Sequence, residues 1–276
     1  MMTEAGCGDG PRGFSAICDT RIPNVARIYD YLLGGKDNFA VDRVAADALM
    51  AAVPGGVPNC LDNRAFLRRA VRSLARAGIR QFVDIGSGLP TKENTHQVAQ
   101  EVASDARVVY VDYDTMVVSH ARALLVDNEH VGAIQRDVRR PAEIVEDEEL
   151  RQHIDFREPV AVIMAAVMHF VSDDERPHEI ARTLTRALPP GSYLVLTHVT
   201  PDHVSQEAKE TALEIYESTS ARLTPRSRAE VLRFFDGLEL VDPGLVDIRF
   251  WHPEIGARLA DSSRPTSFYG GVAKKP

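Results

Sequence analysis

An acidic residue followed by two glycines is the part of the sequence best suited to bind a cofactor. Asp84 stands near the end of the apolar run 81–85, and Gly86 and Gly88 flank Ser87 in the turn before the next helical pattern. Glycine has no Cβ atom, so the backbone of such a turn can adopt positive φ and approach a ligand closely. The pattern predicts a turn that carries a nucleotide-like cofactor.

Two further acids follow the next two predicted strands. Asp112 ends the apolar run 107–112, and Asp137 follows the short run 133–135. An acid at the end of the second strand commonly accepts hydrogen bonds from ribose hydroxyls, and we expect the acid after the third strand to face an adenine amino group. Together with Asp84, these acids predict a site for an adenosine-containing cofactor.

Each of these assignments has an alternative. Asp84 could cap a helix or a turn, and Asp114 could replace Asp112 at the ribose unless it is the N-cap of the following helix. Nicotinamide dinucleotides use the same two glycines and the same acid, but they also favour a third glycine where this chain has Thr91. A dehydrogenase is therefore the weaker alternative.

Short apolar runs alternate with helical patterns from Arg80 onward. Continuous apolar strands separated by helices predict a parallel sheet covered on both faces. The last two strands, 245–251 and 266–273, lack a helix between them, which predicts an antiparallel pair at one edge. We expect an α/β fold with a doubly wound, mostly parallel sheet of seven strands. Other expected elements are strands over 160–167 and 192–199 and helices over 92–103, 116–126, 143–152, 174–187, 203–222 and 227–235.

The chain before Arg80 contains only helical patterns, over 22–33, 41–52 and 59–77. We expect a disordered arm over 1–20, a helical cap over 21–78 and a Rossmann-like cofactor-binding domain over 79–276 that forms one compact unit with the cap. Tyr29 and Asn38 lie on either side of the pair Gly34-Gly35, which either allows a lid to close or belongs to an ordinary packed turn. The five arginines of the third helix predict a solvated face.

Several segments resemble a known family. The run 22–39, IPNVARIYDYLLGGKDNF, closely resembles the opening signature of an actinobacterial family of S-adenosylmethionine-dependent methyltransferases that was long known only as a domain of unknown function. QFVDIGSGLPT at 81–91, VYVDYD at 109–114 and FFDGL at 234–238 are further matches. Residues 226–244 are also similar to the C-terminal part of small-molecule O-methyltransferases. The resemblance covers almost all of the chain after residue 20.

This resemblance implies a class I methyltransferase fold and S-adenosylmethionine as the cofactor. The turn after Asp84 would wrap the methionine part of the cofactor, with the carboxyl of Asp84 near its ammonium group. The resemblance supplies no methyl acceptor. The residues expected to bind the cofactor are Asp84, Gly86, Ser87, Gly88, Asp112, Tyr113, Asp137, Val138, Tyr29 and Asn38.

Methyl transfer from a sulfonium is an in-line displacement, so positioning and exclusion of water carry most of the catalysis. His169 follows the fourth predicted strand and is the candidate general base, although it could instead pack under the adenosine. His198 is a weaker candidate and fits a satisfied core residue. Asn94 and His96 could contact the cofactor's carboxylate or cap their helix.

We expect O- or N-methylation of a small molecule. A cofactor-binding sensor or partner protein without turnover is the alternative, and a nicotinamide oxidoreductase is a weaker one. The net charge of -8 and pI of about 5.6 argue against binding to nucleic acid. The sequence also lacks the Asn/Asp-Pro-Pro-Tyr and Pro-Cys motifs of enzymes that methylate bases.

The three cysteines have no metal-binding spacing, so we expect no metal and reduced thiols. No signal peptide and no apolar run long enough for a membrane span is evident, so we expect a cytoplasmic protein without membrane contact. The sequence leaves monomer and homodimer open.

Overall fold

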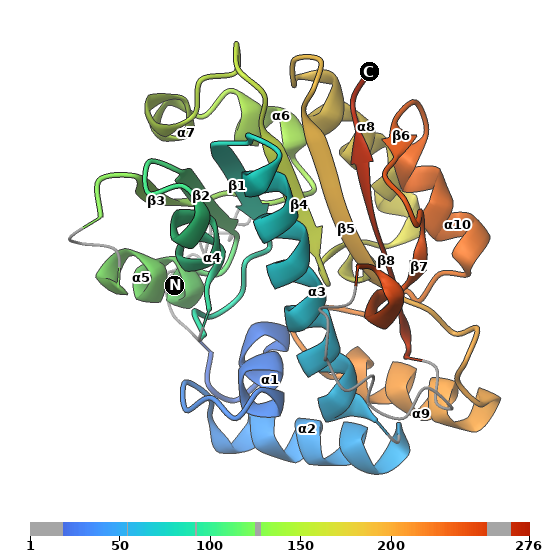
Figure 1. The fold of residues 1–276 in the computed structure, drawn as a ribbon. Helices are drawn as coiled ribbons and strands as arrows, with labels where there is room; N and C mark the ends of the chain where they lie inside the picture. The colour runs from blue at the N-terminus through green and yellow to red at the C-terminus, as the bar shows by residue number, and fades with distance from the viewer. Residues whose placement is uncertain (1–18, 54, 92, 125–127, 253–265) are drawn as a thin grey trace, which may run out of the picture.

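Five parallel strands form the centre of the protein, and an antiparallel strand extends them on one side (Figure 1). The structure is a computed structural model that describes residues 19–53, 55–91, 93–124, 128–252 and 266–276. The strand order β3-β2-β1-β4-β5-β8-β6, with β7 also beside β8, confirms the predicted mostly parallel sheet and its antiparallel edge. The strands are β1 Gln81–Ile85, β2 Arg107–Asp112, β3 Val131–Gln135, β4 Ala161–Ala165, β5 Tyr193–Val199, β6 Glu239–Leu240, β7 Val246–Asp247 and β8 Phe268–Lys274.

The antiparallel edge differs from the prediction in its detail. The prediction of a strand over 245–251 is wrong after Asp247, the last residue of β7, because the chain continues there as a short 3-10 helix, Ile248–Phe250. The carboxylate of Asp247 stabilises this turn by accepting the backbone N–H groups of Arg249 at 3.0 Å and Thr266 at 2.9 Å. β6 and β7 pair with successive stretches of β8, so the described residues form eight strands where the sequence predicts seven.

Helices cover both faces of the sheet, as the apolar strands require. Side chains alternate along β1, so Phe82 packs with α3, α4 and α5 on one face, whereas Val83 packs with α6, α7 and α8 on the other. α10 lies on the second face as well. The bounds are α3 Gly56–Arg76, α4 Thr95–Val102, α5 Thr115–Leu124, α6 Pro141–Val145, α7 Glu148–His153, α8 Pro177–Arg186 and α10 Arg228–Leu232.

Several predicted helices have different bounds in the structure: the helix expected over 203–222 covers only Gln206–Glu217, and that expected over 227–235 is Arg228–Leu232 followed by a 3-10 helix. The helix expected over 143–152 is divided into α6 and α7, because Asp147 caps α7 by accepting the N–H of Leu150 at 2.8 Å. The helix expected from 174 begins only at Pro177. Proline suits the first turn of a helix because it lacks the N–H that would have no partner there.

The remaining helices gather beyond the carboxyl ends of the parallel strands (Figure 1). α1 Val25–Leu32, α2 Ala40–Ala52 and the start of α3 share an apolar cluster with α9 Gln206–Glu217. The sequence predicts a cap formed by 21–78 alone, yet α9 packs into the same cluster. We call α1, α2, α9 and the start of α3 the cap.

No single helix in the described ranges is long and apolar enough to cross a membrane. α2 and α3 reach that length and composition only when taken together, and the pair is bent by 100°. The predicted arm, 1–20, lies outside the described residues except for Asp19 and Thr20.

Candidate active site

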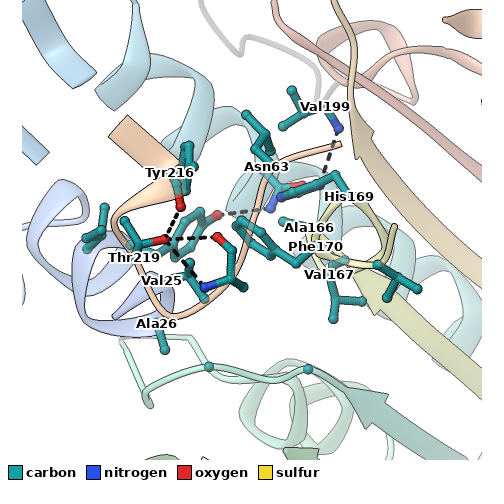
Figure 2. A pocket seen from close by; sticks show the side chains of 18 of the residues that line it. Val25, Ala26, Asn63, Ala166, Val167, His169, Phe170, Val199, Tyr216 and Thr219 are labelled. Carbon is teal, nitrogen blue, oxygen red and sulfur yellow. Dashed lines mark hydrogen bonds between the residues drawn. The ribbon is translucent and has the colours of Figure 1, made fainter. Parts of the chain in front are cut away.

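A cavity of about 580 Å³ lies between the cap and the carboxyl ends of the parallel strands. Open α/β sheets bind ligands at this edge, and the volume is typical of a small-molecule site. Figure 2 shows Asn63 and His169 on one side of the pocket and Tyr216 and Thr219 on another. The predicted site residues that line it are Asp84, Gly86, Ser87, Gly88, Asp112, Tyr113, Asp137, Val138, Tyr29 and His169.

The two glycines of the turn after β1 serve different purposes. Both have positive φ, +68° at Gly86 and +66° at Gly88. A Cβ atom on Gly86 would overlap the side chain of Val167, whereas one on Gly88 would meet no protein atom within 4 Å. Gly86 therefore permits close packing against the loop after β4, and Gly88 leaves open space in which a ligand can approach the backbone.

Asp84 is buried beneath this turn. Its carboxylate accepts a hydrogen bond from the hydroxyl of Thr95 at 2.6 Å, and burial raises its pKa to about 6. The helix-capping alternative fails, because Asn94 occupies the N-cap of α4 and its N–H is bonded to Gln97 at 2.8 Å. Of the two roles considered for Asn94, the structure shows the capping one. A buried carboxylate facing the cavity fits the ammonium group of an amino acid.

Asp112 lies beside the turn at the end of β2. Its Oδ2 accepts the N–H of Gly88 at 3.0 Å and its Oδ1 accepts that of Asp114 at 3.0 Å, while burial raises its pKa to about 6. Each carboxylate oxygen has two lone pairs, so both can still accept a hydroxyl. Asp114 instead caps α5 through Met116 at 2.8 Å and accepts Asn24 Nδ2 at 2.7 Å. Of these two acids, Asp112 is the one that contacts the glycine turn, through the N–H of Gly88, and this contact favours Asp112 at the ribose.

Cofactor affinity should fall as the pH drops through about 6. Protonation of Asp84 or Asp112, whose pKa burial raises to about 6, removes a charge that an ammonium or a hydroxyl would use. Below pH 6, we expect the Kd of S-adenosylhomocysteine to rise about tenfold per pH unit if one of the two carboxyls must be ionised for binding. If both must be ionised, the rise is about a hundredfold per pH unit. Calorimetry between pH 5 and pH 8 measures this, and a constant Kd would contradict it.

Protonation of Asp84 and Asp112 should weaken cofactor binding but stabilise the folded protein. The folded protein holds these two protons more tightly than the unfolded chain, whose aspartates titrate near 3.8. Between about pH 6 and pH 4 the contribution of Asp84 and Asp112 to the free energy of unfolding therefore rises as the pH falls.

Asp137, after β3, has a partner that the sequence analysis missed. Arg139 donates to both of its oxygens, at 2.9 Å from Nε and 2.6 Å from Nη2. Burial raises the pKa of Asp137, but the hydrogen bonds from Arg139 outweigh it and leave the pKa below its usual value. An adenine amino group would share this carboxylate with Arg139, whose guanidinium also lies 5.8 Å from the ring of Tyr113.

The cap contributes a hydrogen-bonded chain that reaches the sheet. The hydroxyl of Tyr29 accepts Asn63 Nδ2 at 2.9 Å, and Asn63 Oδ1 accepts the hydroxyl of Thr197 at 2.7 Å. The same hydroxyl of Thr197 accepts the N–H of Ala166, in the loop after β4, at 2.9 Å. Asn63 was missed by the sequence analysis, although a polar residue one turn before Phe66 on the inward face of α3 is a usable signal.

Asn38 is the one predicted cofactor residue that the structure does not bring to the cavity. Its Nδ2 donates to Asp30 at 2.9 Å and to the carbonyl of Gly35 at 3.1 Å, so it closes the loop between α1 and α2. A Cβ atom on Gly35 would overlap the carboxylate of Asp30. Gly35 is therefore required by close packing, whereas Gly34 is required by its positive φ of +79°. Both constraints favour the packed turn over a hinge.

His169 lines the cavity but is poorly suited to accept a proton. Its Nδ1 accepts the N–H of Val199 at 3.4 Å, which leaves the ring hydrogen on Nε2 (Figure 2). Burial, with His198 and Arg226 nearby, holds the pKa of His169 well below its usual value. In this tautomer Nε2 carries a hydrogen that the ring could donate, and the assignment of His169 as the general base stays a prediction.

The other histidine candidates have partners within the protein. His198 donates through Nδ1 to the carbonyl of Val199 at 2.7 Å and accepts Arg226 Nη1 through Nε2 at 3.0 Å, and burial lowers its pKa to about 3. It is a satisfied core residue, as the weaker assignment expected. His96 Nδ1 bonds the hydroxyl of Tyr110 at 2.8 Å, away from the large cavity.

Arg226 was also missed by the sequence analysis. It is buried, it donates to the carbonyls of Met168 at 2.9 Å and Val171 at 2.8 Å, and it pairs with Asp173 at 2.6 Å. These bonds hold the loop after β4, which carries His169. Within the described ranges, no group of three His, Cys, Asp or Glu side chains is arranged to hold a metal ion.

The sheet order, the glycine turn after β1 and the acid at the end of β2 together define the class I methyltransferase fold. Over residues 13–276 the chain matches the family described as S-adenosyl methyltransferase. The chain belongs to this family and is an S-adenosylmethionine-dependent methyltransferase. Membership of this family identifies the cofactor as S-adenosylmethionine and excludes the nicotinamide dinucleotide that a similar glycine turn could bind.

Two solved structures are similar along nearly their whole length. One is a DUF574 family protein from Streptomyces avermitilis MA-4680, 40% identical, with a TM-score of 0.88 and coverage of 94% of this chain and 99% of that one. The other is a candidate methyltransferase from Thermobifida fusca YX, 39% identical, with a TM-score of 0.86 and coverage of 96% and 98%. Both agree with the actinobacterial resemblance. No curated protein matches this chain.

Proposed function

We propose that this enzyme methylates an oxygen or nitrogen atom of a small molecule held under the cap. The observation that carries the proposal is the continuity of the 580 Å³ cavity, which extends from the Asp84 turn into an apolar chamber between the cap helices. A covered apolar chamber excludes water from a displacement reaction and suits a small, largely apolar acceptor. Residues that line the chamber include Ile28, Leu32, Leu49, Met50, Phe170 and Tyr216.

The donor set of the cavity fits S-adenosylmethionine, which supplies an electrophilic methyl group when bound. Asp84 would hold its ammonium group and Asp112 its ribose, while Asp137 and Val138 would face the adenine. Gly88 leaves room for the ligand beside the backbone. These residues orient the cofactor, and the loop after β4 and the cap place the acceptor.

The chamber also contains a cation suited to an acidic acceptor. Lys209, Ala212 and Tyr216 lie on one face of α9 and all line the cavity. Lys209 is half-buried and forms no ion pair with any described residue. This supports an acceptor with an apolar ring system and an anionic group, such as an aromatic acid.

The test is transfer of label from S-[methyl-³H]adenosylmethionine to an actinobacterial metabolite extract, followed by a panel of aromatic acids and their amides. Label in the small-molecule fraction that disappears with Asp112→Ala supports the proposal, and a preference for acids over amides supports the role of Lys209. Label found only in protein or nucleic acid would overturn it. Tight binding of S-adenosylhomocysteine without any transfer would favour the cofactor-binding sensor.

Substitution of His169 distinguishes a donor that orients the acceptor from a base. Loss of one orienting hydrogen bond, about 0.5–1.5 kcal/mol, lowers kcat about tenfold at most, whereas loss of a general base costs about a hundredfold or more. We expect His169→Gln to lower kcat by about tenfold or less and to leave the Kd of S-adenosylhomocysteine within twofold. A larger loss of kcat, together with loss of the acidic limb in the pH profile of kcat at saturating cofactor, would show that His169 acts as a general base.

A further inference from the structure

Arg64 occupies the wall of the cavity next to the glycine turn. It is half-buried on α3, where Cys60, Asn63, Arg64 and Leu67 repeat at helical spacing and all line the cavity. It also lines a small neighbouring pocket together with Asp84 and Gly88. The sequence predicts a solvated face for the arginines of this helix, and Arg64 departs from that prediction.

The positive charge of Arg64 acts on the groups expected at the methionine end of the cofactor. Burial raises the pKa of Asp84, and the charge of Arg64 partly opposes that rise. The same charge opposes the rise that burial causes in the pKa of Tyr29. The charge of Arg64 thus acts both on Asp84, which belongs to the sheet, and on Tyr29, which belongs to the cap.

The other arginines of the cavity are neutralised by carboxylates. Arg136 pairs with Asp147 at 2.5 Å, Arg139 with Asp137 at 2.6 Å, and Arg222 with Glu217 at 3.1 Å. These cations have their charges balanced within the protein.

Arg64 has no such carboxylate among the described residues. It donates from Nη2 to the backbone carbonyl of Glu93 at 3.1 Å, while the carboxylate of Glu93 pairs with Arg68 at 2.8 Å. A guanidinium has five N–H donors in a planar fork that matches a carboxylate. Arg64 therefore brings spare donors and an unbalanced charge to the cavity wall.

We propose that Arg64 binds the α-carboxylate of the cofactor's methionine portion, with Asp84 taking the ammonium group. The inference rests on the placement of the cofactor proposed above. An α-amino acid end carries one positive and one negative charge, and the cavity offers an acid and an unbalanced base beside the same turn. The pair would fix the direction of the methionine chain and thereby the direction of its methyl group.

Two ligands that differ in the amino acid end test this assignment by calorimetry. S-adenosylhomocysteine carries the carboxylate, whereas 5′-deoxy-5′-methylthioadenosine has the same nucleoside and thioether without it. We expect Arg64→Met to weaken S-adenosylhomocysteine about tenfold to a hundredfold, the usual worth of a charge-assisted bond, and to leave methylthioadenosine within twofold. Arg64→Lys should recover part of the loss.

Arg72→Met is the matched control, because Arg72 lies on the same helix and pairs with Glu101 outside the cavity. It should leave the affinity for both ligands unchanged. Equal losses for both ligands in Arg64→Met and Arg64→Lys, or no loss for either, would overturn the assignment. Failure of the unaltered protein to bind S-adenosylhomocysteine would instead count against the proposed cofactor site as a whole.

Discussion

Asp112→Ala should weaken the binding of S-adenosylhomocysteine at least a hundredfold. Hydrogen bonds to a charged group are worth about 1.5–3 kcal/mol each, and two ribose hydroxyls would lose theirs together. The backbone N–H groups of Gly88 and Asp114 would also lose their acceptor, which loosens the turn that carries the cofactor. Calorimetry at pH 8, where the carboxyl is ionised, measures the effect.

Two variants separate the ribose contact from the support of the turn. Asp112→Asn keeps one acceptor oxygen and should lose less affinity than the alanine variant. Asp114→Ala removes the cap of α5 and should lower the free energy of unfolding by about 1 kcal/mol while changing the affinity by less than threefold. If Asp112→Ala binds normally and Asp114→Ala does not, the ribose contact belongs to Asp114.

Asp42→Ala should lower the free energy of unfolding by about 3–5 kcal/mol, the usual result of breaking a buried ion pair from one side. Arg27 Nε lies 2.7 Å from Asp42 Oδ2, and their side chains are 3% and 0% exposed. The carboxylate also accepts the N–H of Asn24 and of Phe39, each at 2.8 Å. The variant therefore removes the carboxylate that balances a buried guanidinium, which keeps its bond to the carbonyl of Ile22 at 2.7 Å, and it leaves two amides without their acceptor.

Urea unfolding followed by circular dichroism measures this loss. Glu101→Ala, which removes the exposed partner of Arg72, is the control and should change stability by about 1 kcal/mol or less. A loss below about 1.5 kcal/mol in Asp42→Ala would show that the cap rearranges to solvate Arg27, because burial without a partner costs more than that. The result bears directly on the role of the N-terminal signature, whose Asn24 and Arg27 both contact this carboxylate.

The sheet was predictable because its evidence is local. Apolar runs such as 107–112 are too continuous for a surface strand, and the glycines at 86 and 88 mark a turn before α4. The positions of Asp84 and Asp112 follow from the strands that precede them, since carboxyl ends of parallel strands meet at one edge. Chain order therefore determines much of the cofactor side of the cavity.

The acceptor side was predicted less well, because it depends on contacts between distant segments. α9 joins α1 and α2 through an apolar cluster that no spacing within residues 206–217 reveals. Asn38 is polar and lies in the signature, yet Asp30 in the preceding helix uses it to close a loop. For such residues, composition indicates polarity but not the partner that satisfies it.

The sequence by itself determined the fold class, the glycine turn and the acids that follow β1, β2 and β3. Only the tertiary structure distinguished among side chains of one chemical type. It showed Arg64 at the cavity and Arg72 outside it, and it placed the backbone N–H of Val199 against Nδ1 of His169. Periodicity specifies which face of an element is buried, whereas the protonation and pairing of a side chain depend on neighbours that only the packed fold supplies.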